Sequence, residues 1–90
     1  MSAYDTFKQA QALLEANVTA TAIALRAIPG AGSGSMGLTP DAVKASPEYR
    51  SAKAAYDAAF HALREFNGKW VNVFAAEIKA ERAARYKEQP

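Results

Sequence analysis

The most constraining feature of this sequence is one long run of helical periodicity between Pro47 and Lys87. Apolar or small side chains recur there in alternating steps of three and four residues, which places them on one stripe of an α-helix. The stripe consists of Tyr49, Ala52, Tyr56, Ala59, Leu63, Phe66, Trp70 and Val73, widened on one flank by Phe60, Phe74 and Ile78. The pattern predicts a long amphipathic helix over about residues 47–87.

Local signals bear on the start of this helix and on its continuity. Ser46 is a suitable N-cap, and Pro47 suits the first helical position. Asn67-Gly68 is a dipeptide that often marks a turn, but the apolar stripe keeps its phase across it. We therefore expect the helix to continue, with Gly68 on the outer face, where glycine costs about 1 kcal/mol relative to alanine.

A second amphipathic pattern predicts a first helix over about residues 3–27, ending before Pro29. Ser2 can cap this helix, and Asp5 lies in its first turn, where a negative charge is favourable. Gln11 and Thr21 interrupt an apolar face made of Tyr4, Phe7, Leu14, Val18, Leu25 and Ile28.

The segment 29–38 is rich in glycine and serine, and we expect a flexible connection there. Residues 32–37 spell G-x-G-x-x-G, but in a dinucleotide-binding fold that motif follows a strand and opens a helix. Here it follows a predicted helix, so we interpret it as a linker and expect no cofactor. A short helical turn is predicted over 40–45, since Thr39 is a suitable N-cap and proline follows it.

These elements predict an all-α fold, an antiparallel helical hairpin in a single domain over residues 1–90. Helix 3–27 would fold back on the long helix and bring Leu14 near Leu63. One end of the hairpin would hold an aromatic cluster with Tyr4, Phe7, Trp70, Val73 and Phe74 close together. Residues 75–90 would project beyond the first helix as a helix end and tail.

Two helices cannot cover each other's apolar stripes, so one flank of such a hairpin stays exposed. We expect self-association into a helical bundle, with a dimer favoured. The alternative is a monomer closed by the segment 40–45. The residues expected to carry interaction and assembly are Tyr4, Phe7, Leu14, Tyr56, Leu63, Phe66, Trp70 and Phe74.

The sequence gives little reason to expect an enzyme or a metal site. It has no cysteine and a single histidine, His61, so neither thiolate chemistry nor a recognisable nucleophile–base pair is expected. Asp57 and Glu65 flank His61 at helical spacing, but their carboxylates would lie about 12 Å apart along the axis, too far to share one ion. We interpret these residues as a ridge of ion pairs, extended by Lys53 and Lys69.

Charge offers a weaker hypothesis. The formal net charge is +2, and the C-terminal part carries Lys79, Arg82 and Arg85, which could contact nucleic acid. Glutamates are interleaved with these residues, and Glu81 is well placed to pair with Arg85. Nucleic acid is therefore a less favoured partner than protein.

The remaining expectations concern location and role. The N-terminus lacks a signal-peptide pattern, and the most apolar window, 18–25, is too short to cross a bilayer, so we expect a cytoplasmic protein away from membranes. The most favoured function is protein–protein interaction, with self-association or a protein partner of unknown identity. The alanine-rich, cysteine-free composition resembles that of small accessory proteins of bacteria and phages. That resemblance would imply binding to a host protein and its inhibition.

Overall fold

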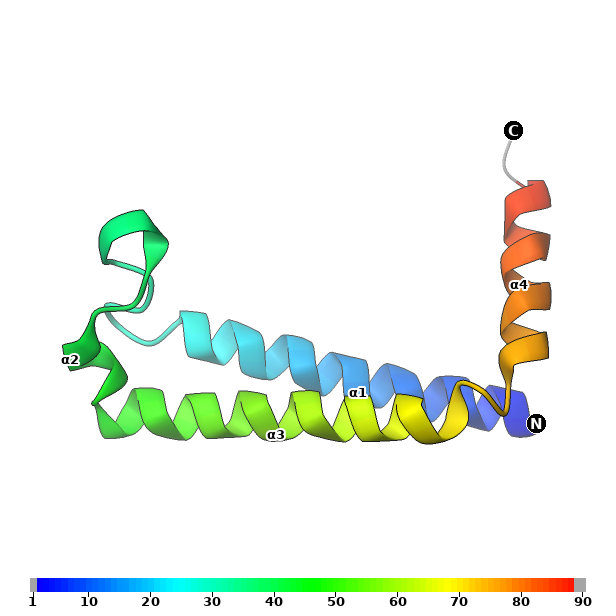
Figure 1. Cartoon of the computed structure of the whole chain (residues 1–90), viewed down its shortest axis with the longest axis horizontal. Helices are drawn as coiled ribbons and strands as arrows, with labels where there is room; N and C mark the ends of the chain where they lie inside the picture. Colours follow the sequence, from blue (N-terminus) through cyan, green and yellow to red (C-terminus); the bar gives the residue numbers. More distant parts are fainter. Residues whose placement is uncertain (1, 89–90) are drawn as a thin grey trace.

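The protein is an all-α helical hairpin with a short arm, described by a computed structural model over residues 2–88 (Figure 1). Within that range there are no strands, and the helices are α1 (Ala3–Arg26), α2 (Asp41–Lys44), α3 (Pro47–Trp70) and α4 (Ala75–Glu88). The helices α1 and α3 lie side by side and antiparallel (Figure 1). The predicted fold class is confirmed, and residues 89 and 90 of the expected tail lie outside the described range.

The N-termini of the two long helices are capped as their sequences predict. The Ser2 Oγ accepts a hydrogen bond from the Asp5 N–H (3.1 Å), and the Asp5 carboxylate accepts one from the Ser2 N–H (3.3 Å). This reciprocal arrangement is a capping box. At the start of α3, the Ser46 Oγ accepts from the Tyr49 N–H (3.2 Å), and Pro47 occupies the first position.

The expected single helix over residues 47–87 is wrong in its second half, because the chain breaks after Trp70. The helix does run through Asn67-Gly68, as predicted, and apart from the adjacent residues and the helix's own backbone no atom lies within 4 Å of the position that a Gly68 Cβ would take. Beyond it the backbone turns, with hydrogen bonds from the Phe74 N–H to the Trp70 carbonyl (3.2 Å) and from the Ala75 N–H to the Asn72 carbonyl (3.4 Å). We call residues 71–74 the elbow.

Tertiary packing explains the elbow, since residues 71–74 contain neither glycine nor proline. The Phe74 ring packs on α1, with its centroid 4.9 Å from that of Phe7 and 5.8 Å from that of Tyr4. A straight helix would carry the following residues past the start of α1, whereas the bend directs α4 away from the hairpin axis (Figure 1). Val73, expected in the aromatic cluster, is instead 61% exposed on the elbow.

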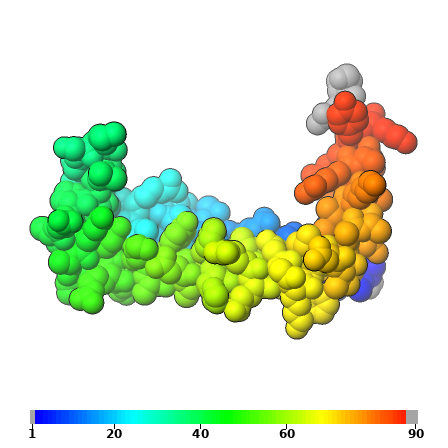
Figure 2. All heavy atoms as spheres, in the orientation of Figure 1, coloured from blue at the N-terminus to red at the C-terminus, as the bar shows by residue number. Residues whose placement is uncertain are grey.

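The connection between α1 and α2 is built of hydrogen-bonded turns. It includes a 3₁₀ turn over Ser35–Gly37, and the Gly34 N–H donates to the Leu38 carbonyl (2.8 Å). A Cβ on Gly34 would lie 2.7 Å from that carbonyl oxygen, so this close approach requires glycine. The predicted turn over 40–45 is present as α2. The connection and α4 rise from opposite ends of the hairpin on the same side (Figure 2).

The hairpin has a thin core. Among residues 2–87, only Phe7 and Ala59 are buried, and the rest of the α1–α3 seam is half-buried. The radius of gyration is 17.9 Å, whereas a compact domain of this length has a radius of gyration of about 12 Å. The fold therefore leaves much of its apolar surface in contact with solvent.

Candidate interaction surface

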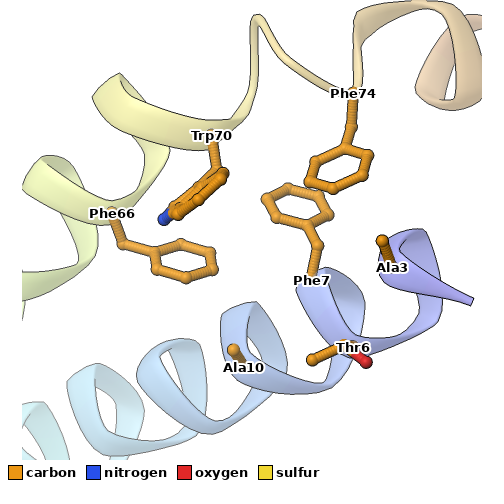
Figure 3. A pocket seen from close by; sticks show the side chains of 7 residues that line it. All are labelled: Ala3, Thr6, Phe7, Ala10, Phe66, Trp70 and Phe74. Atoms are coloured by element: carbon orange, nitrogen blue, oxygen red, sulfur yellow. The ribbon is translucent and has the colours of Figure 1, made fainter.

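An aromatic cluster forms where the start of α1 meets the end of α3 (Figure 3). Phe7 lies at its centre, with ring centroids 5.5 Å from Phe66 and 4.9 Å from Phe74, at separations typical of favourable aromatic pairs. Tyr4 and Trp70 extend the cluster through Phe74, at 5.8 and 6.4 Å. The predicted grouping of these side chains is confirmed, except for Val73; Phe66 joins it.

The cluster does not close completely. It leaves a groove of about 450 Å³, which we call the aromatic groove, lined by Ala3, Thr6, Phe7, Ala10, Phe66, Trp70 and Phe74 (Figure 3). Thr6 carries the only polar side chain among these lining residues, and its hydroxyl donates to the Ser2 carbonyl (3.2 Å). The walls are therefore almost entirely apolar. Such a groove can accept an apolar side chain and offers little to a charged one.

The other residues predicted for assembly lie further along the hairpin. Leu14, Tyr56 and Leu63 are half-buried, and their positions in the apolar stripes place them along the seam between α1 and α3. Tyr56 stacks on Phe60, with ring centroids 6.2 Å apart. These residues therefore belong to the internal packing of the hairpin, apart from the aromatic groove. Phe60 was expected to widen the apolar stripe, and it is 43% exposed.

One polar pair crosses the seam. The Gln11 Nε2 donates a hydrogen bond to the Asn67 Oδ1 (2.9 Å), and both side chains are half-buried. In the sequence Gln11 only interrupts an apolar face and Asn67 only suggests a turn, yet the register that brings Leu14 near Leu63 places Gln11 within one residue of Asn67. The antiparallel register therefore places the two polar side chains opposite each other, and it is the signal that predicts the pair.

The Glu81 side chain links α4 to α1 through contacts that the sequence analysis did not predict. Its Oε2 accepts hydrogen bonds from the Tyr4 hydroxyl (2.8 Å) and the Lys8 Nζ (3.0 Å), and its Oε1 lies 3.7 Å from an Arg85 nitrogen. The hydrogen bonds from Lys8 and then Tyr4 lower the pKa of Glu81 below its ordinary value. The hydrogen bond to Glu81 in turn raises the pKa of Lys8 above its ordinary value. Only the Arg85 contact was expected, because the other two depend on the elbow.

The basic residues of α4 face a second hollow. A groove of about 540 Å³ between α1 and α4 is lined in part by Lys8, Lys79, Arg82 and Arg85, with Glu81 among them. Lys8 and Arg85 contact Glu81, whereas Lys79 and Arg82 form no ion pair within the described residues. The structure therefore brings the three predicted nucleic-acid contacts to one groove and adds Lys8.

The ridge on α3 carries ion pairs, as expected. The Lys53 Nζ lies 3.1 Å from the Asp57 carboxylate, and the His61 Nε2 lies 3.0 Å from the Glu65 carboxylate. All four side chains are exposed, so these pairs add little stability. Lys69 was expected to extend the ridge, and it lies instead over the Trp70 ring, 5.0 Å from its centroid.

Among residues 2–88, no three histidine, aspartate or glutamate side chains are grouped to hold a metal ion.

No protein-family model, curated protein or solved structure matches the chain. Within the described residues, no helix combines the length and apolar character that crossing a bilayer requires.

Proposed function

We propose that the protein is a helical protein–protein interaction module that self-associates. The observation that carries this proposal is its accessible surface of 6752 Å². A compact monomer of this mass exposes about 5,100 Å², so the chain exposes roughly a third more than its size requires. The excess is on the order of 1,600 Å², about twice what one partner contributes to a standard interface.

The exposed surface includes apolar side chains on both helices of the hairpin. Leu13 on α1 and Phe60 on α3 are 74% and 43% exposed, and the aromatic groove opens at the end of the same hairpin. Exposed apolar side chains beside an open apolar groove are typical of a site covered by another chain. A second copy is the simplest cover, since hairpins of this kind pair into four-helix bundles.

The test is the mass of the particle in solution. Sedimentation velocity or light scattering on a size-exclusion column, over at least a hundredfold range of concentration, should give a dimer at the upper end. Because association stabilises only the folded chain, the thermal midpoint should also rise with concentration. A monomer at every concentration, with a constant midpoint, would overturn the proposal.

A second candidate function rests on the basic groove. Lys79 and Arg82 line the hollow between α1 and α4 with Lys8 and Arg85, and a polyanion such as single-stranded nucleic acid suits that charge. The test is binding of a labelled oligonucleotide at 50 and 200 mM salt, with Lys79→Glu and Arg82→Glu variants. Affinity that falls steeply with salt and with either variant is expected. No binding at low salt would remove this candidate.

A further inference from the structure

The aromatic groove has the form of a socket for a side chain from another helix. Its α1 wall consists of Ala3, Thr6, Phe7 and Ala10, spaced at i, i+3, i+4 and i+7. Four residues with this spacing form the hole into which a knob inserts when two helices pack closely. Phe66, Trp70 and Phe74 deepen this hole from the opposite side.

A knob lies on the same side of the same helix. Leu13 follows Ala10 by one turn, only about 60° around the helix axis, and it is 74% exposed. Lys8, which contacts Glu81 of α4, lies about 160° from Ala10. The contacts of α4 with α1 are therefore on another side of the helix, and the side of α1 with the knob and the hole stays open.

The spacing of knob and hole fits a second copy of the chain. The centre of the hole, between Thr6 and Phe7, lies about 10 Å along α1 from Leu13, and Ala10 lies midway. We infer that two copies pair through this side of α1, antiparallel and about a two-fold axis near Ala10, so that Leu13 of each copy fills the aromatic groove of the other. This inference rests on the proposed self-association and specifies its interface.

Size and charge agree with that pairing. An isologous interface brings the same patch of both copies together, so a patch with charge of one sign would meet charge of the same sign. This side of α1 carries only uncharged residues, namely Ala3, Thr6, Ala10, Leu13, Asn17, Ala20 and Ala24. The small side chain at Ala10 allows the two backbones to approach closely at the axis. The excess surface also exceeds the roughly 800 Å² that each partner of a standard dimer buries.

Cysteine cross-linking tests the axis directly, because the chain has no cysteine of its own. In Ala10→Cys the two thiols of a dimer should lie within reach of one disulfide, which spans Cα atoms up to about 6.8 Å apart. In Ala24→Cys, on the same side, they should lie about 40 Å apart. Mild oxidation should therefore give a covalent dimer for Ala10→Cys and leave Ala24→Cys monomeric on a non-reducing gel.

A pair of truncations tests the knob. Leu13→Ala should raise the dimer dissociation constant at least about tenfold, because each dimer loses two buried side chains. Ile23→Ala is the matched control, since Ile23 is also an exposed aliphatic residue of α1 but lies about 140° from Ala10. It should leave the constant unchanged. Circular dichroism should show the same helix content in both, as each side chain is mostly exposed in the single chain.

The outcomes separate this interface from self-association in general. A dimer that cross-links at residue 10 and is weakened by Leu13→Ala supports the inference. The inference is overturned, and self-association is left intact, by a dimer that fails to cross-link at residue 10 or cross-links equally at residue 24. A dimer whose dissociation constant is unchanged by Leu13→Ala has the same consequence. A monomer at all concentrations overturns both.

Discussion

The Tyr4 hydroxyl donates a 2.8 Å hydrogen bond to Oε2 of Glu81, which joins residues 77 positions apart in the sequence. The Lys8 ammonium shares the same oxygen at 3.0 Å. These bonds attach α4 to the first two turns of α1, and Phe74 packs on the same part of α1 through the Phe7 ring. The direction of α4 is thus set by contacts with the opposite end of the chain.

Removing the Glu81 carboxylate should loosen α4 while leaving the hairpin folded. In Glu81→Ala, Tyr4 and Lys8 lose their shared acceptor, so amide hydrogens of residues 75–88 should exchange faster. Exchange within α1 and α3 should change little. Glu77→Ala is the matched control, because it removes a glutamate from the first turn of the same helix. Equal exchange rates in α4 of the wild type and Glu81→Ala would contradict the role of Glu81.

Acid should weaken the attachment of α4. Hydrogen bonds from Lys8 and Tyr4 lower the pKa of Glu81 in the folded state, so its contribution to stability is present above the ordinary pKa of 4.5. That contribution is lost as the pH falls through the lowered pKa. Thermal unfolding followed between pH 7 and pH 2 should show a smaller acid-dependent loss for Glu81→Ala than for the wild type. Parallel curves would show that the carboxylate makes no difference.

Phe7 should be the most sensitive aromatic position. It is 4% exposed and contacts three other rings, so Phe7→Ala should lower the free energy of unfolding by about 3–5 kcal/mol. Phe60→Ala removes the same ring from a position that is 43% exposed, and it should cost clearly less. Urea unfolding followed by circular dichroism measures both. Similar losses for the two variants would contradict the placement of Phe7 at the centre of the cluster.

Two glycine substitutions should change the free energy of unfolding in opposite directions. Gly68→Ala should raise the free energy of unfolding by up to about 1 kcal/mol, because the site is helical and the added Cβ would meet nothing within 4 Å beyond the adjacent residues and its own helix backbone. Gly34→Ala should lower it, since its Cβ would meet the Leu38 carbonyl oxygen at 2.7 Å. Urea midpoints at equal protein concentration compare the two. A stabilising Gly34→Ala would contradict the close approach in the connection.

Much of the fold follows from local signals in the sequence. The caps at Ser2 and Ser46, the apolar stripes and the unbroken phase across Asn67-Gly68 correctly predict α1, α3 and the hairpin. The aromatic cluster follows from the antiparallel register. The elbow could not be predicted in this way, because residues 71–74 contain no helix breaker and the bend depends on the contact between Phe74 and Phe7.

The candidate surface was less accessible to sequence reasoning. The rings at its base belong to the apolar stripes, but the groove depends on the small residues Thr6 and Ala10, which carry no signal of their own. Leu13 lies outside the α1 stripe and becomes informative only beside that groove. Glu81 was expected to pair within its own helix, and its contact with Tyr4 requires the elbow.

The elbow also bears on the order in which the chain folds. The helices α1 and α3 rest on contacts between near neighbours, and such contacts form fast. The contacts of α4 with Tyr4 and Lys8 span nearly the whole sequence and can form only after the hairpin has brought the two ends together. We therefore expect the nascent chain to pass through a straight, locally helical form of residues 47–88, with the bend acquired last.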